Sequence, residues 1–291
     1  MISVNMWKKR INMEKLRRIK YGLILLLFLP GCLDTPDPEI HFLSEIYYPE
    51  LDYKIGKLDP AVKSEYWLNI LDFSDKSDYD AGYIDYANQI DLSRFIDTAG
   101  RLLNHGRVVT NNYDNQWPFI VYSSSNDTIA YVLANILQSL GYTQVYFYSG
   151  GTTDWLENGG HLNLTYEGFK AWYNKHHPFE DTMQALIDIH PYSWYRGDSI
   201  LSGHIPGAIN IPAADLVESS GGSYAILDSG KILTDTITDL SAKIVVYHSM
   251  GNEELSNSFL WAAAELGYTN LYLFPDGYDQ WLEHGQEITG K

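Results

Sequence analysis

Two stretches of this 291-residue chain repeat the same order of residues. The first runs from Tyr122 to Trp155 and the second from Tyr247 to Trp281, spans of 33 and 34 positions that differ by one insertion. Both contain an apolar run, the tetrapeptide Leu-Gly-Tyr-Thr, a second apolar run, and a glycine ahead of a Trp-Leu-Glu-x-Gly element. So many matched offsets predict two domains of one fold rather than a single large core.

Each copy alternates short strands with amphipathic helices. The runs at 119–122 and 244–247 are apolar and β-branched, as is typical of strands buried on both faces. Apolar residues at helical spacing follow each run and stop at a glycine, Gly141 or Gly267, which is a common helix end. A further apolar run then predicts a second strand. This order predicts a parallel sheet, in which ligands bind at loops that follow strand ends.

Two further elements stand upstream of the second copy. Asp188 ends an apolar run, and residues 203–212 read Gly-His-Ile-Pro-Gly-Ala-Ile-Asn-Ile-Pro. With the Gly-x-x-x-Trp element at 277–281, these segments resemble the rhodanese, or sulfurtransferase, family. In the first copy the corresponding segment is eroded to 82–90, with Asp72 in place of the aspartate.

The resemblance implies an α/β fold with two rhodanese-like domains, each a parallel-sheet α/β/α sandwich. We place domain 1, which is degenerate, at 55–165 and domain 2 at 166–291.

Rhodaneses transfer sulfur through a cysteine that begins the loop after a strand. The resemblance aligns that active-site loop with two segments of this chain: His248, Ser249, Met250, Gly251, Asn252, Glu253 and Glu254, and Ser123, Ser124, Ser125, Asn126, Asp127 and Thr128. The cysteine is thus replaced by His248 and by Ser123, and the second arginine of the family loop by Glu253. Neither an imidazole nor a hydroxyl holds a sulfane sulfur as a thiolate does. We therefore expect no sulfur transfer, that is, a pseudoenzyme without a catalytic residue of the usual kind.

Three side chains are candidates for a pocket that remains in domain 2: Asp188, His190 and His248. The resemblance places His190 where the family often has arginine, near Asp188. His248 is suited to act as a general base, a soft-metal ligand, or a hydrogen-bond donor to an oxyanion. The interpretation we prefer is simpler, namely that a drifted loop leaves His248 capping its own backbone. No close-spaced histidine pair on a predicted helix supports a metal site, and we expect no cofactor.

The N-terminal segment contains the only cysteine of the chain, Cys32. It follows a basic leader and an apolar run at 22–29 that is too short for a membrane span of about 20 residues. The segment Leu-Pro-Gly-Cys resembles the bacterial lipobox, which implies cleavage before Cys32 and its acylation. We therefore predict a signal peptide at 1–31, beginning at Met1, Met6 or Met13, and an extended, lipid-anchored tether at 32–54.

The protein is accordingly expected in the bacterial cell envelope, at the outer rather than the inner membrane. Of the 20 Lys and Arg residues, seven lie in the leader with one of the 37 acidic residues, so the remainder has a net charge near −23. A surface this acidic excludes nucleic acid as a partner. We interpret it as a solubility feature rather than a cation site.

Two functions stay open. The leading one is a non-catalytic binding or scaffolding module, with an envelope protein as its partner and the membrane held through Cys32. The alternative is a thiol-independent enzyme that handles an oxyanion or a metal with the His248 loop. A small oxyanion ligand fits either function.

Overall fold

The computed structural model describes residues 44–47, 51, 68–91, 93, 117–124, 127–179, 182–198, 202–220, 223–249 and 251–290. Residues 41–291 form one compact unit. The predicted signal peptide and Cys32 lie outside the described residues. In the part of the chain that the structure describes, no helix has the length and apolar character of a membrane span.

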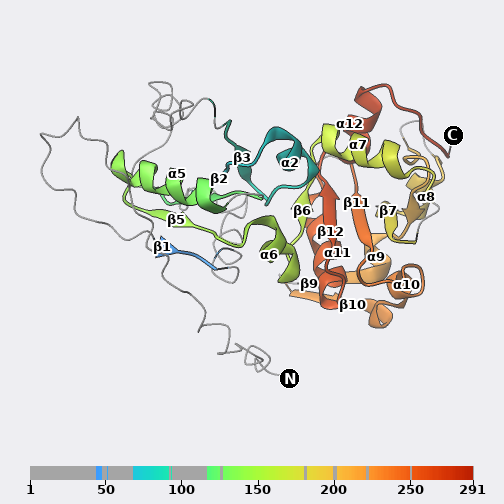
Figure 1. Cartoon of the computed structure of the whole chain (residues 1–291). Helices are drawn as coiled ribbons and strands as arrows, with labels where there is room; N and C mark the ends of the chain where they lie inside the picture. The colour runs from blue at the N-terminus through green and yellow to red at the C-terminus, as the bar shows by residue number, and fades with distance from the viewer. Residues whose placement is uncertain are drawn as a thin grey trace, which may run out of the picture. The chain divides into compact units, whose positions relative to one another are not determined.

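Domain 1 is built on a five-stranded parallel sheet, as predicted (Figure 1). The strand order is β1-β5-β4-β2-β3, and every pair is parallel. The strands are β1 (Ser44–Glu45), β2 (Asn69–Asp72), β3 (Ala87–Gln89), β4 (Phe119–Tyr122) and β5 (Val145–Phe147). The helices are α2 (Lys76–Ala81), α5 (Asp127–Ser139) and α6 (Gly151–Glu157).

Domain 2 repeats this sheet. Its order is β6-β12-β11-β7-β8, again all parallel, so each strand has a counterpart at the same place in the first sheet. The strands are β6 (Leu162–Asn163), β7 (Gln184–Asp188), β8 (Ile209–Asn210), β11 (Lys243–Tyr247) and β12 (Leu271–Phe274). The helices are α7 (Tyr166–His176), α8 (Tyr192–Tyr195), α9 (Ala213–Leu216), α10 (Lys231–Thr234), α11 (Glu253–Glu265) and α12 (Gly277–Glu283), with a 3-10 turn, η2 (Leu227–Gly230).

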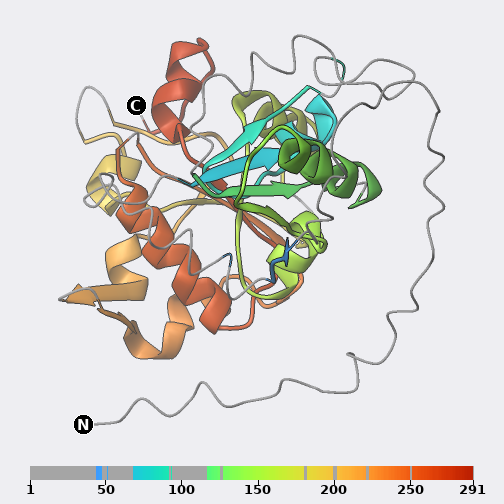
Figure 2. The same ribbon diagram turned by 90° about the vertical axis from the view of Figure 1, so that its left-hand side faces the viewer.

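Helices cover both faces of the second sheet because side chains alternate along its central strand. Ile244 and Val246 of β11 pack with α9, α10 and α11, whereas Val245 and Tyr247 pack with α7 and α12. A hairpin of β9 (Val217–Ser220) and β10 (Ser223–Ile226) lies against α11 (Figure 2). The fully buried β-branched run is what predicted this two-sided core.

The predicted tether needs a correction. We expected residues 32–54 to be an extended linker, but Ser44–Glu45 forms β1, which pairs in parallel with β5. Ile46 and Leu51 are completely buried in the core of domain 1. An edge strand is as extended as a linker, so the prolines of this segment did not distinguish the two. β6, which precedes the boundary we predicted at 165, pairs with β12 of domain 2.

Candidate functional site

The site lies at the carboxyl ends of β7 and β11, which are neighbours in the sheet. Asp188 and Tyr247, the last residues of these strands, are register partners. Asp188 is completely buried and accepts three hydrogen bonds: from the Tyr247 hydroxyl (2.7 Å), the His190 backbone N–H (2.8 Å) and His190 Nδ1 (2.7 Å). The carboxylate therefore fixes both the strand end and the imidazole.

His190 continues this chain of hydrogen bonds to the loop. Its Nε2 lies 2.7 Å from the Ser249 hydroxyl oxygen and also accepts the Ser249 backbone N–H at 3.1 Å. Because Nδ1 faces a carboxylate, Nδ1 carries the proton and Nε2 is the acceptor. The order is thus carboxylate, imidazole, hydroxyl, with the Ser249 side chain only partly buried.

His248, at the position of the family's cysteine, lies beside this chain of groups. Its ring stacks on that of His190 with the centroids 4.0 Å apart, and the Trp194 ring also stacks with His190, at 4.9 Å. Burial, followed by the neighbouring His190, lowers the pKa of His248 to about 4. Its Nδ1 donates to the backbone carbonyl of Ser249 at 3.3 Å. His248 is therefore neutral at neutral pH and contacts its own loop backbone.

The glycine of the Gly-x-x-x-Trp element holds the loop in place. Gly277 has φ +46°, and a Cβ there would lie 1.7 Å from the His248 carbonyl oxygen. The next residue, Tyr278, donates its backbone N–H to that same oxygen at 3.0 Å. The first residue of the loop is thus fixed by a turn that only glycine fits.

Domain 1 has the same framework without the imidazole. Asp72 accepts the Ser74 backbone N–H at 2.7 Å, and the Ser74 hydroxyl oxygen lies 2.8 Å from both the backbone nitrogen and the hydroxyl of Ser124. Ser74 therefore takes the place of His190, and Ser124 that of Ser249. Burial raises the pKa of Asp72. At the position of His190 this site has a serine, which is a far weaker base than an imidazole.

The three pocket candidates, Asp188, His190 and His248, thus lie together as the sequence suggested. What the sequence analysis missed is that Ser249 completes the chain and that Tyr247, which we took for a core residue, bonds to Asp188. A serine at the second loop position of both copies was the signal available. Ser125, Asn126 and Met250 lie outside the described residues. Among those described, no three His, Cys, Asp or Glu side chains are placed to hold a metal ion.

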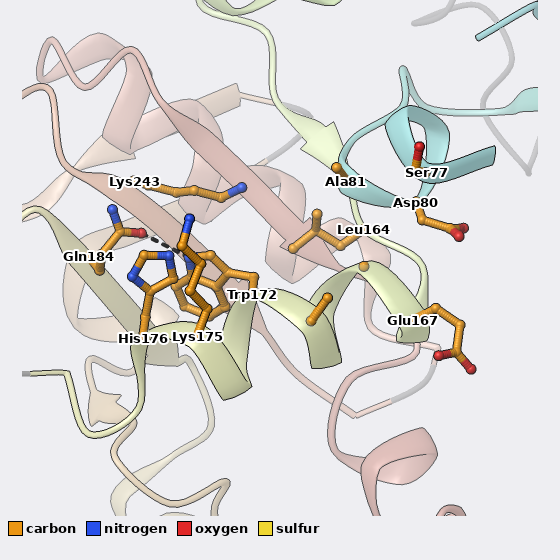
Figure 3. A pocket seen from close by; sticks show the side chains of 12 residues that line it. Ser77, Asp80, Ala81, Leu164, Glu167, Trp172, Lys175, His176, Gln184 and Lys243 are labelled. Carbon is orange, nitrogen blue, oxygen red and sulfur yellow. Dashed lines mark hydrogen bonds between the residues drawn. The ribbon is translucent and has the colours of Figure 1, made fainter. Parts of the chain in front are cut away.

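A second concave region lies between α2 and α7. This cavity of about 590 Å³ is lined by both helices and by β7 and β11. Lys243, Lys175 and His176 gather at one side of it, while Asp80 and Glu167 lie toward the other (Figure 3). No sequence pattern indicated this cavity, because it depends on how the two helices pack.

The packing of α2 on α7 is close. Thr165, the N-cap of α7, donates its hydroxyl to the Asp80 carboxylate at 2.8 Å. A Cβ at Gly168 would lie 1.7 Å from the Asp80 carbonyl oxygen, so this glycine permits the contact. At this edge of the cavity the backbones of α2 and α7 are therefore in van der Waals contact.

Lys243 is the cation most enclosed by the cavity wall. Burial lowers the pKa of Lys243 to about 8, and its ammonium lies 3.5 Å from the centroid of the Tyr272 ring. Nearby, the Trp172 indole N–H donates to the Gln184 side-chain oxygen at 2.8 Å. A bound anion would offset the cost of burying this charge.

Comparison with known proteins settles the architecture. A family model for the rhodanese-like domain matches residues 56–158 and 167–284. The chain belongs to the rhodanese-like family. The two matches fall on the two sheets and confirm the predicted tandem arrangement.

Solved structures similar to this rhodanese-like chain include YnjE and two enzymes named for sulfur transfer. YnjE shares 15% identity over 85% of this chain and 68% of its own, with a TM-score of 0.36. The 3-mercaptopyruvate sulfotransferase SseA from Escherichia coli shares 20% identity, covering 81% and 99%, with a TM-score of 0.33. Thiosulfate sulfurtransferase from Pseudomonas aeruginosa shares 19%, covering 86% and 44%, with a TM-score of 0.31. No curated protein matches the chain by sequence.

Proposed function

We propose that this rhodanese-like protein does not transfer sulfur and acts as a binding module of the bacterial cell envelope, anchored by lipid on Cys32. One observation carries the proposal: the position of the family's thiolate is filled by His248, whose neutral imidazole donates to its own loop. In domain 1 the same position holds Ser123. A thiolate is the nucleophile in sulfur transfer, and neither residue supplies one.

The test is a sulfur-transfer assay on the full-length protein in detergent, with thiosulfate as donor and cyanide as acceptor. We expect thiocyanate formation no faster than with the heat-denatured protein. Turnover above that background that persists in Cys32→Ala would refute the proposal, because the sulfur would then move without any thiol.

The cavity beside Lys243 is the proposed ligand site, and its ligand is a small anion. The whole chain has a net charge of −17, so its overall field repels anions. Lys243 and Lys175 line one side of the cavity, so this region is locally positive although the chain as a whole is negative (Figure 3). An anion here gains a charge-assisted hydrogen bond in a partly enclosed place, where screening by water is weaker than at the open surface. This supports the oxyanion that the sequence left open, but in the cavity rather than at the His248 loop.

The ligand proposal is tested by thermal shift with sulfate, phosphate, thiosulfate and acetate. We expect at least one to raise the melting temperature, and Lys243→Met to remove that rise. Lys231→Met is the matched control, because Lys231 is exposed and pairs with Asp228 on the surface. The rise should also fade above about pH 8, as Lys243 loses its proton. An equal rise in wild type and Lys243→Met would exclude this cavity as the site.

The envelope location is tested separately. Cells that express the chain and are fed an alkyne analogue of palmitate should incorporate it, and Cys32→Ala should not. Fractionation of the membranes then distinguishes outer from inner. Incorporation that survives in Cys32→Ala would refute the anchor and leave the sulfur-transfer result untouched.

A further inference from the structure

We propose that Ser249 is a nucleophile activated by His190, with Asp188 as the positioning residue, and that domain 2 transfers acyl groups from uncharged esters or thioesters to water. This goes beyond the proposed function, because it assigns a reaction to a loop that has lost its thiol. Three distances support it: Ser249 Oγ to His190 Nε2 is 2.7 Å, His190 Nδ1 to Asp188 Oδ1 is 2.7 Å, and Tyr247 OH to Asp188 Oδ2 is 2.7 Å.

The protonation states that these contacts require are those of a general base. Asp188 accepts from Nδ1, so the proton of the neutral imidazole sits there and the Nε2 lone pair faces the serine. The Ser249 hydroxyl must then donate to Nε2. A serine is a weak nucleophile at its own pKa and is activated by such a base within about 2.6–3.2 Å.

The imidazole is held rigidly in this orientation. The Trp194 and His248 rings both stack against it, at 4.9 and 4.0 Å between centroids, and the His190 side chain is only 2% exposed. Asp188 cannot turn away, because it is completely buried and also accepts the His190 backbone N–H. A base that is already oriented loses no free energy to reorganisation during the reaction.

The duplicated domain argues that this chain of groups is more than a scaffold for the loop. In domain 1, Ser74 holds Ser124 through the same two contacts that His190 makes to Ser249, at 2.8 Å each. A serine therefore suffices to fix the loop. His190 provides what Ser74 does not, a basic ring nitrogen that can take up the serine proton during the reaction.

The reaction balances without an oxidant or a metal. Ser249 Oγ bonds to the acyl carbon as its proton passes to Nε2, and the carbonyl electron pair moves to oxygen. When that electron pair re-forms the carbonyl double bond, the alcohol or thiol leaves and takes the proton from Nε2. Water, activated in turn by His190, then hydrolyses the acyl-serine and releases a carboxylic acid. Once Nε2 is protonated, the Ser249 backbone N–H loses its acceptor and is free to donate to the new oxyanion.

The charge of the loop restricts the substrate. Glu253 and Glu254, the last two residues of the loop segment, are exposed in the first turn of α11. Like charges in this position repel an anionic acyl donor. The acyl group is therefore uncharged, and the free acid is expelled after hydrolysis.

The test uses an uncharged fluorophosphonate ester on the full-length protein in detergent, followed by peptide mass spectrometry. We expect one adduct, on Ser249, and none on Ser124, which serves as the control inside the same molecule. Ser249→Ala should abolish labelling, whereas Ser124→Ala should leave it unchanged. His190→Gln should slow it by about 100-fold or more, the usual contribution of a general base.

A pH profile separates a catalytic from a structural His190. In wild type the labelling rate should rise through one ionisation and then level off, and in His190→Gln this step should vanish. Circular dichroism confirms that each variant is folded. No adduct on Ser249, or equal rates in wild type and a folded His190→Gln, would refute the proposal. Sulfur transfer and anion binding are measured on other residues, so their failure is distinguishable from this one.

Discussion

Lowering the pH from 7 to 5 should destabilise the protein through His161, which follows α6. The His161 Nε2 is shielded from solvent and has no hydrogen-bond partner among the described residues. Its backbone carbonyl accepts the indole N–H of Trp155 at 2.7 Å, so the chain is fixed at this position. Burial lowers the pKa of His161 to about 4.

The sign follows from proton uptake. Between pH 6.5 and 4 the unfolded chain binds a proton at His161 and the folded chain does not, so stability falls as the pH falls through this window. With these two pKa values, the loss in the free energy of unfolding from pH 7 to pH 5 is about 2 kcal/mol. His248, whose pKa is also lowered to about 4, adds a loss of the same sign. The contribution of His161 must therefore be isolated by a variant.

Urea denaturation at pH 7 and pH 5 measures the contribution of His161 to this loss of stability. His161→Leu removes the titrating group, so its loss of stability over this range should be smaller than that of wild type by about 2 kcal/mol. His284→Leu, at an exposed position, is the control and should keep the wild-type pH dependence. If wild type and His161→Leu lose the same stability between the two pH values, His161 is not buried in the neutral form.

Four substitutions test the packing. Gly277→Ala places a Cβ 1.7 Å from a loop carbonyl and at φ +46°; we expect a loss of about 1–3 kcal/mol in thermal or urea unfolding. Gly285→Ala, also at positive φ but with nothing within 4 Å, should cost less. Gly168→Ala would clash with the Asp80 carbonyl and should abolish any anion-induced thermal shift while both domains stay folded by circular dichroism. Trp281→Phe removes the indole hydrogen bond to a backbone carbonyl and should cost about 1 kcal/mol.

The central strands were predictable because their residues lie in fully apolar, β-branched runs. β4 and β11 are buried along their length, apart from the first residue of β11, as expected for central strands covered on both faces. β1 was not predictable. Its two residues pair through backbone groups, which every residue type offers, so its composition carries no signal. The repeat does not extend to that segment, and so it could not help.

The site was predictable only as far as strand ends determine it. Asp188 ends β7 and His248 directly follows β11, its parallel neighbour, so their proximity follows from the sheet. The bond between His190 and Ser249 depends on the conformation of the loop, which the sequence does not reveal. Lys243 was hidden for a similar reason: it begins a strand, and its burial depends on α7 packing over it.

Comparison of the two domains separates what the fold needs from what a reaction would need. The shared contacts are the indole N–H bonds of Trp155 and Trp281, the backbone N–H bonds to the hydroxyls of Tyr122 and Tyr247, and the close approach of Gly151 and Gly277 to the loop carbonyls. These contacts position the loop in both copies, so they are part of the architecture and would persist in a protein with no chemistry. The copies differ at Ser74 and His190, the groups that face the loop. Membership of the family therefore explains the frame, while any reaction depends on His190, which domain 1 replaces with Ser74. A search for activity should begin at domain 2, with domain 1 as its natural control.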